Sequence, residues 1–352
     1  MDCKRASSAA VVLGALLCAF FFCGRFATAQ VPDVEAVWRQ MFKRPDTPPA
    51  PPDNPLTPEK IALGAQLFSD PRLSGTGRHS CASCHRPTRA FTDGRRQARA
   101  LTGEALRRNT PALWNLAWSK QFFWDGRAPS LEAQVRMPIE ATDEMAGDWP
   151  SILQRLTADA GVVSQFQAAF PVELAISEDT VVKALASYVR SLVSPPTRFD
   201  AWIEGDAGAL TAAEERGFRL FTGKAGCMLC HVGWRFTDDR FHDIGLPGKD
   251  PGRAAIPEGT PGRMAFKTPS LRDLDRTAPY MHDGSLPTLA AVLRHYTGGF
   301  VSRPTLAPHI NRRLRLSARE KDDLIAFLRT LSSTKKATPP PPLPVPTRRG
   351  PG

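Results

Sequence analysis

Two short stretches, CASCH at 81–85 and CMLCH at 227–231, decide the fold of this 352-residue chain. In each, two cysteines separated by two residues are followed directly by a histidine. This C-x-x-C-H spacing is typical of c-type haem attachment, in which the sulfurs bond the haem vinyl groups and the histidine ligates the iron. A C-x-x-C pair alone could also form a redox disulfide or half of a zinc site. Because both pairs end in histidine, covalent attachment of two haems is the favoured interpretation.

The other cysteines lie in an N-terminal segment with the features of an export signal. Lys4 and Arg5 are followed by an apolar run over 9–23 and by small residues at 27–29. We therefore predict that residues 1–29 are a secretory signal peptide and that the protein is exported to the periplasm. The apolar run is short for a membrane span, so we expect no stable membrane insertion. An uncleaved anchor is the alternative.

The chain repeats itself around the two haem motifs. TPEKIALGAQLF (57–68) precedes the first and TAAEERGFRLF (211–221) precedes the second; both have a threonine at the N-cap position and share a G-x-x-L-F ending. Downstream, ALASYVRSL (184–192) matches LIAFLRTL (324–331), whose helix is predicted to begin with a capping box at Ser317. Chance similarity between amphipathic helices is the alternative, but the order is the same in both halves.

This order predicts a mainly α fold with two tandem cytochrome c-like domains and long loops, each domain carrying one covalent c-type haem. We place the N-terminal domain at 50–195 and the C-terminal domain at 208–334, each large enough for a core. Residues 30–49 form an N-terminal segment, and residues 335–352 form a Pro-rich basic tail that is expected to be extended.

The chain is basic, with a formal net charge of +11. Such a balance could accelerate encounter with an acidic electron donor. A basic surface without a dedicated partner is the alternative. Nucleic acid is not expected as a partner of an exported haem protein.

The residues available as ligands opposite each iron differ between the two halves. Between residues 86 and 226 there is no histidine, and the methionines are Met137 and Met145, which are as well suited to core packing. A first iron without a protein ligand would be open to a small molecule. After the second motif several side chains could ligate iron, and spacing does not choose among them. These are Met264, Met281, His282, His295 and Tyr296.

With these features, the sequence resembles the bacterial di-haem cytochrome c peroxidase family, and within it the MauG-like branch. The resemblance covers nearly all of the chain that follows the predicted signal peptide, apart from its Pro-rich ends. It is carried by both haem motifs and by RNTPALWN (108–115), FWDGRAPSLEAQ (123–134), PIEATDEM (138–145), FHDIGLP (241–247) and TAPYMHDGS (277–285).

The resemblance implies different tasks for the two haems, a peroxide site at the first and electron transfer at the second. Reductively activated peroxidases have a distal histidine shortly after the first motif, and this chain has none there. The first haem is therefore expected to be five-coordinate, with His85 as its iron ligand. At the second haem His231 is one ligand, and Tyr296, fourteen residues after His282, takes the place of the axial methionine of the peroxidases. A phenolate ligand lowers the potential of the iron; a packed aromatic is the alternative role.

The resemblance also assigns residues above the first haem. Glu144 matches the glutamate that moves protons during peroxide cleavage, with Glu140 and Asp143 as neighbouring alternatives. Gln134 matches the glutamine that hydrogen-bonds the bound oxygen, and Pro138 matches the residue that narrows the pocket.

Two further assignments concern the region between the haems. Trp124 matches the tryptophan that couples them, with a core position as the alternative. Asn109, Thr277 and Pro279 match an inter-haem calcium site, for which the asparagine side chain and two backbone carbonyls would supply oxygen ligands.

One position departs from the MauG pattern. MauG oxidises its protein substrate through a surface tryptophan two residues before the second motif, where this chain has Ala225. This difference counts against modification of a methylamine dehydrogenase precursor, although Trp234 could be another exit for oxidising equivalents.

We therefore expect an exported enzyme that reduces hydrogen peroxide to water, with a small cytochrome c or cupredoxin as electron donor. The alternatives are oxidative modification of a partner protein and a non-catalytic di-haem electron carrier.

Overall fold

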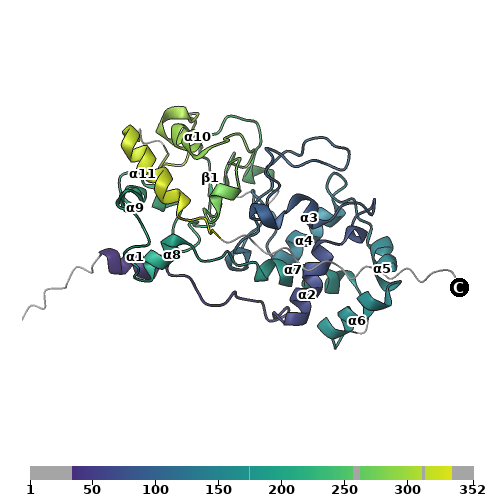
Figure 1. The fold of residues 1–352 in the computed structure, drawn as a ribbon. Helices are drawn as coiled ribbons and strands as arrows, with labels where there is room; N and C mark the ends of the chain where they lie inside the picture. The colour runs from purple at the N-terminus through teal and green to yellow at the C-terminus, as the bar shows by residue number, and fades with distance from the viewer. Residues whose placement is uncertain (1–33, 174, 257–261, 311–313, 335–352) are drawn as a thin grey trace, which may run out of the picture.

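The computed structural model of the chain is mainly helical, as predicted, with long connecting loops (Figure 1). The predicted signal peptide (1–29) and the predicted tail (335–352) lie outside the described residues. Within the described part of the chain, no helix has the length and apolar character needed to cross a membrane. The structure describes residues 34–173, 175–256, 262–310 and 314–334.

The helices form two groups that lie on opposite sides of Figure 1. The group on the right contains α2 (Pro58–Phe68), α3 (Cys81–Cys84), α4 (Leu131–Glu140), α5 (Trp149–Thr157), α6 (Ala160–Ala169) and α7 (Glu178–Ser191). The group on the left contains α1 (Val34–Phe42), α8 (Arg198–Ile203), α9 (Ala212–Thr222), α10 (Leu289–Arg294) and α11 (Ala318–Arg329).

Strands are scarce in the described residues, as predicted. The one sheet pairs β1 (Phe241–His242) with β2 (Phe266–Lys267) in an antiparallel register, with Phe241 opposite Lys267. Because both strands have only two residues, the sheet holds two loops of the second half together rather than forming a layer of its own.

Each group of helices has its own hydrophobic core. One buried cluster is drawn from residues 63–192, and Cys81 packs against it. The other is drawn from Phe42 and from residues 199–331, with Cys227 packed against it. Each haem motif is therefore placed at the side of a separate core.

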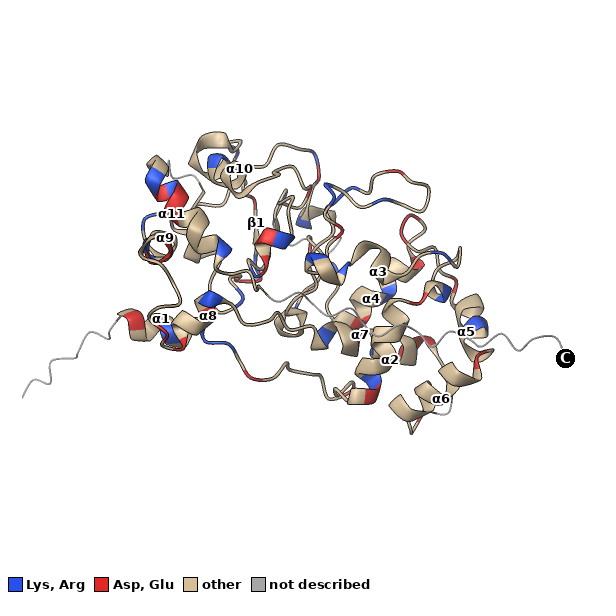
Figure 2. Cartoon of the chain, in the orientation of Figure 1, with Lys and Arg blue, Asp and Glu red and all other residues tan. Residues whose placement is uncertain are grey.

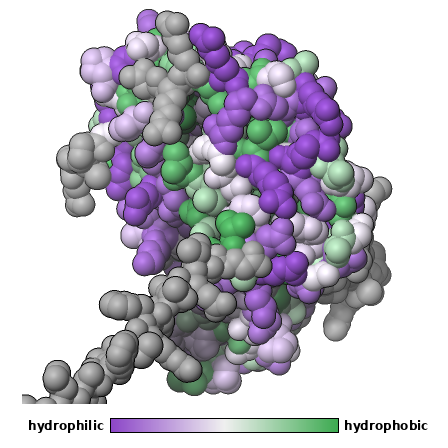
Figure 3. All heavy atoms as spheres, turned by 90° about the vertical axis from the view of Figure 1, so that its left-hand side faces the viewer, coloured by the Kyte–Doolittle hydropathy of each residue, from purple (hydrophilic) through white to green (hydrophobic). Residues whose placement is uncertain are grey.

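The first helix packs with the second half of the chain. Phe42 of α1 is fully buried in the second cluster, and the ring of Trp38 lies edge-on to that of Phe218, with 4.9 Å between centroids. From α1 the chain runs along the lower edge of Figure 1 to reach α2 in the other group. The face that carries α1, α9 and α11 is largely hydrophilic, with smaller hydrophobic areas between the polar side chains (Figure 3). Helix α1 thus helps to close the core around the second motif.

The repeated helices begin as the sequence predicts. Thr57 caps α2 by accepting a hydrogen bond from the Lys60 backbone N–H at 3.2 Å. Capping boxes begin α9 at Thr211 and α11 at Ser317, each with a glutamate at the third helical position. These signals involve residues within one turn, so they can be read from the sequence without knowledge of the packing.

The glycine of each G-x-x-L-F ending lies where two helices meet. In the first half α2 packs against α7, and a Cβ on Gly64 would lie 2.0 Å from the Ala184 carbonyl oxygen. In the second half α9 packs against α11, and a Cβ on Gly217 would lie 2.0 Å from the Asp323 carbonyl oxygen. The repeat therefore preserves a close helix–helix contact that admits no side chain.

Alanine at Gly64 or Gly217 is expected to lower the free energy of unfolding by about 1–3 kcal/mol, because the new methyl group overpacks the helix contact. Urea unfolding of the haem-loaded protein measures the change. Gly161→Ala in α6 is the control, since a Cβ there meets only the Asp159 side chain, at 3.2 Å. Equal effects of all three substitutions would contradict the packing argument.

Candidate functional site

One cavity of about 1420 Å³ is lined by both C-x-x-C-H motifs. Sites for a single small molecule are commonly about 300–1,000 Å³, so this cavity has room for more than one large ligand. The four cysteines of the motifs are not in disulfides. Free thiols in pairs, each followed by a histidine on the wall of a large and mostly apolar cavity, fit two covalently attached haems.

Each motif histidine is oriented by a hydrogen bond to a backbone carbonyl. The Nδ1 of His85 donates to the Phe91 carbonyl oxygen at 2.8 Å, and the Nδ1 of His231 donates to the Phe236 carbonyl oxygen at 2.9 Å. This tautomer leaves the Nε2 lone pair available as an iron ligand. Burial lowers the pKa of both imidazoles, which favours the neutral form that ligates metals.

The turns that supply these carbonyls contain a repeat that the sequence analysis missed. Phe91 and Phe236 both have left-handed backbone conformations, with φ of 60° and 55°. Each is the first residue of an F-T-D triplet, at 91–93 and 236–238. The shared triplet was visible in the sequence, although its role depends on where the turn brings the carbonyl.

The predicted acid–base residues lie in the cavity wall of the first half. Gln134 and Pro138 are four residues apart on α4 and so share one face of that helix, and both line the cavity. Glu144 follows α4 and also lines the cavity. Burial is the main cause that raises the pKa of the Cys81 and Cys84 thiols, and the charge of the nearby Glu144 adds to both shifts. Burial raises the pKa of Glu144 itself, and the charge of Asp143 adds to that shift.

The structure distinguishes Glu144 from Glu140, one of the two neighbouring carboxylates that the sequence also offered for proton transfer. Glu140 accepts a hydrogen bond from the Trp149 indole nitrogen at 2.7 Å and does not line the cavity, whereas Asp143 lines it beside Glu144. Of the two methionines in this half, Met137 is 37% exposed and Met145 is buried in the first core. Met137 is therefore not placed to ligate an iron in the cavity.

In the second half the structure distinguishes Tyr296, which lines the cavity, from the adjacent His295, which does not. After α10 the chain makes a π-helical turn over His295–Gly299, a distortion frequent at functional sites. Tyr296 lines the cavity, and burial raises its pKa, with the charges of Cys227 and Cys230 adding to the effect. His295 instead donates from Nε2 to the Ile244 carbonyl oxygen at 2.8 Å and does not line the cavity.

The remaining candidate iron ligands of the second half are Met264, Met281 and His282. Met281 and His282 line the cavity, whereas Met264 does not. The His282 ring stacks on Phe266 with 3.4 Å between centroids. Met281, His282 and Tyr296 therefore line the cavity, and Tyr296 also lies near the cysteines of the second motif.

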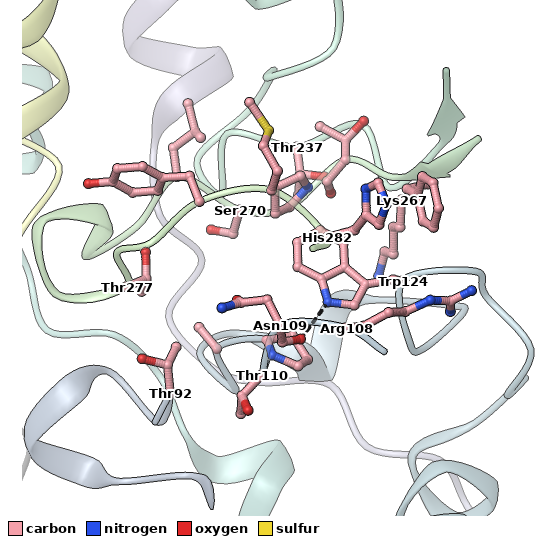
Figure 4. Close-up of a pocket in the computed structure, with 18 of the residues that line it drawn as sticks. Thr92, Arg108, Asn109, Thr110, Trp124, Thr237, Lys267, Ser270, Thr277 and His282 are labelled. Atoms are coloured by element: carbon pink, nitrogen blue, oxygen red, sulfur yellow. Dashed lines mark hydrogen bonds between the residues drawn. The ribbon is translucent and has the colours of Figure 1, made fainter. Parts of the chain in front are cut away.

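Trp124 lies where the two halves meet (Figure 4). Its indole nitrogen donates to the Asn109 carbonyl oxygen at 2.9 Å, and its own carbonyl accepts from the Lys267 backbone N–H at 2.7 Å. Its ring is edge-on to that of His282, with 6.5 Å between centroids. Residues of both halves therefore hold Trp124 in place.

The predicted calcium residues line the same cavity. Asn109 and Thr277 are drawn in Figure 4, and Pro279 is also in the wall. The Asn109 side-chain nitrogen donates to the Arg95 carbonyl oxygen at 2.8 Å, which leaves its Oδ1 available to a cation.

The cavity wall also includes residues to which the sequence analysis gave no role. His79 precedes the first motif, and His242 and His309 belong to the second half. A single histidine carries little signal in a sequence, because its neighbours in space come from distant segments.

Comparisons with known proteins agree with the geometry. Residues 58–208 match the family described as di-haem cytochrome c peroxidase. The chain is 50% identical to the methylamine utilization protein MauG of Methylorubrum extorquens over 90% of both chains. It is 35% identical to the cytochrome-c peroxidase IdrP1 of Denitromonas iodatirespirans, over 82% of this chain and 85% of that protein. Among solved structures, a MauG-like protein associated with microbial copper homeostasis matches with a TM-score of 0.75 at 35% identity, covering 82% of this chain and 94% of the other.

Substituting Tyr296 with phenylalanine is expected to change the spin state and optical bands of one haem, because the phenol oxygen beside the second motif is removed. Optical and EPR spectra of the oxidised, haem-loaded protein measure this. His295→Gln is the matched control, since His295 is bonded to the Ile244 carbonyl and should leave the spectra unchanged. If Tyr296→Phe leaves both haem spectra intact, Tyr296 is not an iron ligand.

Proposed function

The chain belongs to the di-haem cytochrome c peroxidase family, and we propose that it is an exported enzyme that reduces hydrogen peroxide to water. It is an oxidoreductase with two haems c as its cofactors. The observation that carries the proposal is the single cavity that joins both C-x-x-C-H motifs to Glu144 and Gln134.

In this proposal the cysteines and histidine of each motif hold one haem. When bound, the two haems would supply irons that change oxidation state, and the first would also bind peroxide. The protein must then move protons, since reduction of one H₂O₂ to two H₂O consumes two electrons and two protons. The side chains that surround the open position decide how fast those protons move.

Glu144 is the residue we assign to proton transfer. Its carboxylate takes a proton from one oxygen of peroxide and gives it to the other, which leaves as water when the O–O bond breaks. A pKa raised by burial suits a group that must both accept and donate. Gln134 supplies an amide for hydrogen bonding to the reacting oxygen. Pro138, which has no backbone N–H, presents an apolar surface that narrows the site.

The second half of the chain takes up and relays electrons in this proposal. His231 and Tyr296 would both hold the second iron, and Trp124 lies between the two motifs. The donor is proposed to be a small acidic cytochrome c or cupredoxin. Lys and Arg are spread over both groups of helices rather than gathered at one place (Figure 2), so the basic charge favours encounter without marking a docking surface.

Calcium is a further part of the proposal. The available Oδ1 of Asn109, together with the backbone carbonyls of Thr277 and Pro279, offers the neutral oxygen ligands that Ca²⁺ accepts. The ion would hold a segment of the first half against a segment of the second.

A second candidate function is oxidative modification of a partner protein. The 50% identity to the methylamine utilization protein MauG favours it. Ala225, partly buried against the second core where MauG has a surface tryptophan, counts against the same exit route. The acid–base residues in the cavity disfavour the third possibility, a carrier without catalysis.

Glu144→Gln is expected to slow the reaction with peroxide by ~10²–10⁴-fold without loss of haem, because the amide cannot accept and return the proton. Stopped-flow absorbance after mixing with peroxide measures the rate. Glu140→Gln is the matched control, since Glu140 is bonded to Trp149 outside the cavity. Unchanged kinetics in Glu144→Gln would remove Glu144 from the mechanism.

The proposed function is tested by EPR titration of the oxidised, haem-loaded protein with peroxide in the absence of reductant. We expect one high-spin and one low-spin ferric signal, both lost after about one equivalent of peroxide. Two low-spin signals that do not respond to peroxide would mean that a protein residue closes the first iron, and the proposal would fail.

A further inference from the structure

The two haem motifs are followed by equivalent carboxylates. Asp93 and Asp238 end the two F-T-D triplets, and each accepts a hydrogen bond on Oδ1 from the backbone N–H two residues later, at 3.0 and 2.9 Å. Burial lowers the pKa of His85 and of His231, and the negative charge of the aspartate in the same half opposes that shift. Each aspartate therefore lies close enough to its motif histidine to act on it electrostatically.

The second carboxylate oxygen distinguishes the two halves. Asp238 Oδ2 is bonded to His242 Nε2 at 2.8 Å. Asp93 is 5% exposed, and its Oδ2 is buried with no hydrogen-bond partner among the described residues. The residue at the position equivalent to His242 is Gln97, whose side-chain nitrogen donates to the Arg107 carbonyl oxygen instead, at 2.8 Å.

His242 brings a positive charge to the second motif. Its hydrogen bond with Asp238 is the first cause that raises its pKa, to about 10, and Cys230 adds to the shift. When Cys230 becomes a haem thioether its contribution is lost, but the bond to Asp238 remains. Ligand atoms of Cys230, Asp238 and His242 all lie within 4.8 Å of one another, and His242 lines the cavity. The second motif thus faces an ion pair with no net charge.

The first motif has no comparable partner for its carboxylate. Arg86 and Arg95 act electrostatically on Cys84, but both side chains are exposed, so water and salt screen their charges. No ion pair joins either of them to Asp93 within the described residues. The negative charge of Asp93 is therefore buried beside His85 without a neutralising group.

We propose that Asp93 and the Asp238–His242 pair are positioning residues that set the reduction potentials of the two irons apart. The buried carboxylate beside His85 stabilises the more positive oxidation states of the first iron, which peroxide cleavage requires. The His242 imidazolium cancels the equivalent charge at the second iron, so the carboxylate there does not lower the potential of that iron. Charge, burial and hydrogen bonding around the ligands are established means of tuning haem potentials. The inference rests on the assignment of the two haems in the proposed function.

The first test is a spectroelectrochemical titration of haem-loaded Asp93→Asn, with EPR to distinguish the two haems. Asparagine keeps the Oδ1 acceptor and removes the charge. We expect the reduction equilibrium of the first haem to shift at least tenfold toward the ferrous form, which is a rise of about 59 mV for one electron, with the second haem unchanged. An unchanged first potential, or equal changes at both haems, would overturn the role of Asp93.

The second test uses the ion pair itself. His242→Gln should lower the potential of the second haem alone, because Asp238 is left uncompensated. The double variant Asp238→Asn with His242→Gln should restore the potential, since both charges are gone. A purely structural role predicts that the double variant departs further from the wild type. That result, or no shift in the single variant, would overturn the proposal.

The charge assignment and the peroxidase proposal can be disproved separately, the first by the haem potentials and the second by the reaction with peroxide. Shifted potentials in a protein that does not react with peroxide would refute the peroxidase proposal and support the charge assignment. Normal peroxide reactivity with unmoved potentials would support the peroxidase proposal and refute the charge assignment.

Discussion

The hydrogen bond from each motif histidine to a phenylalanine carbonyl is the interaction on which the rest of the site depends. It selects the imidazole tautomer and leaves the Nε2 lone pair available as a ligand on a histidine that lines the cavity. To supply that carbonyl, the backbone at Phe91 and Phe236 adopts a left-handed conformation that residues other than glycine rarely adopt. Both phenylalanine rings are buried in their cores, so packing maintains the two turns.

Around these two turns the chain repeats one packing arrangement. In each half a glycine lets the helix before the motif approach a second helix closely, and each pair contributes to a separate core. The cavity lies between the cores, where Trp124 is held by residues from both halves. Because neither half encloses the cavity alone, the site depends on the two halves being held against each other.

The two halves share this packing arrangement, but the side chains around their motifs differ and suit different chemical roles. Glu144 and Gln134 line the wall near the first motif, and Tyr296 lies beside the second. The same contrast extends behind the motif histidines, where Asp93 has a buried oxygen without a partner and Asp238 is paired with His242. Duplicated geometry with altered charges is a physical way to make two similar cofactors behave differently.

The sequence by itself determined what depends on short spacing: the C-x-x-C-H motifs and the helix caps at Thr57, Thr211 and Ser317. It also ranked Glu144 and Tyr296 among their neighbours through resemblance to a family. Tertiary structure alone decided that Glu140 bonds Trp149 and that His295 bonds the Ile244 carbonyl. Asp143 and Glu144 in the first half, and Met281, His282 and Tyr296 in the second, are the candidates that line the cavity. Local patterns record contacts within a turn of the chain, whereas the direction of a side chain depends on partners far away in sequence.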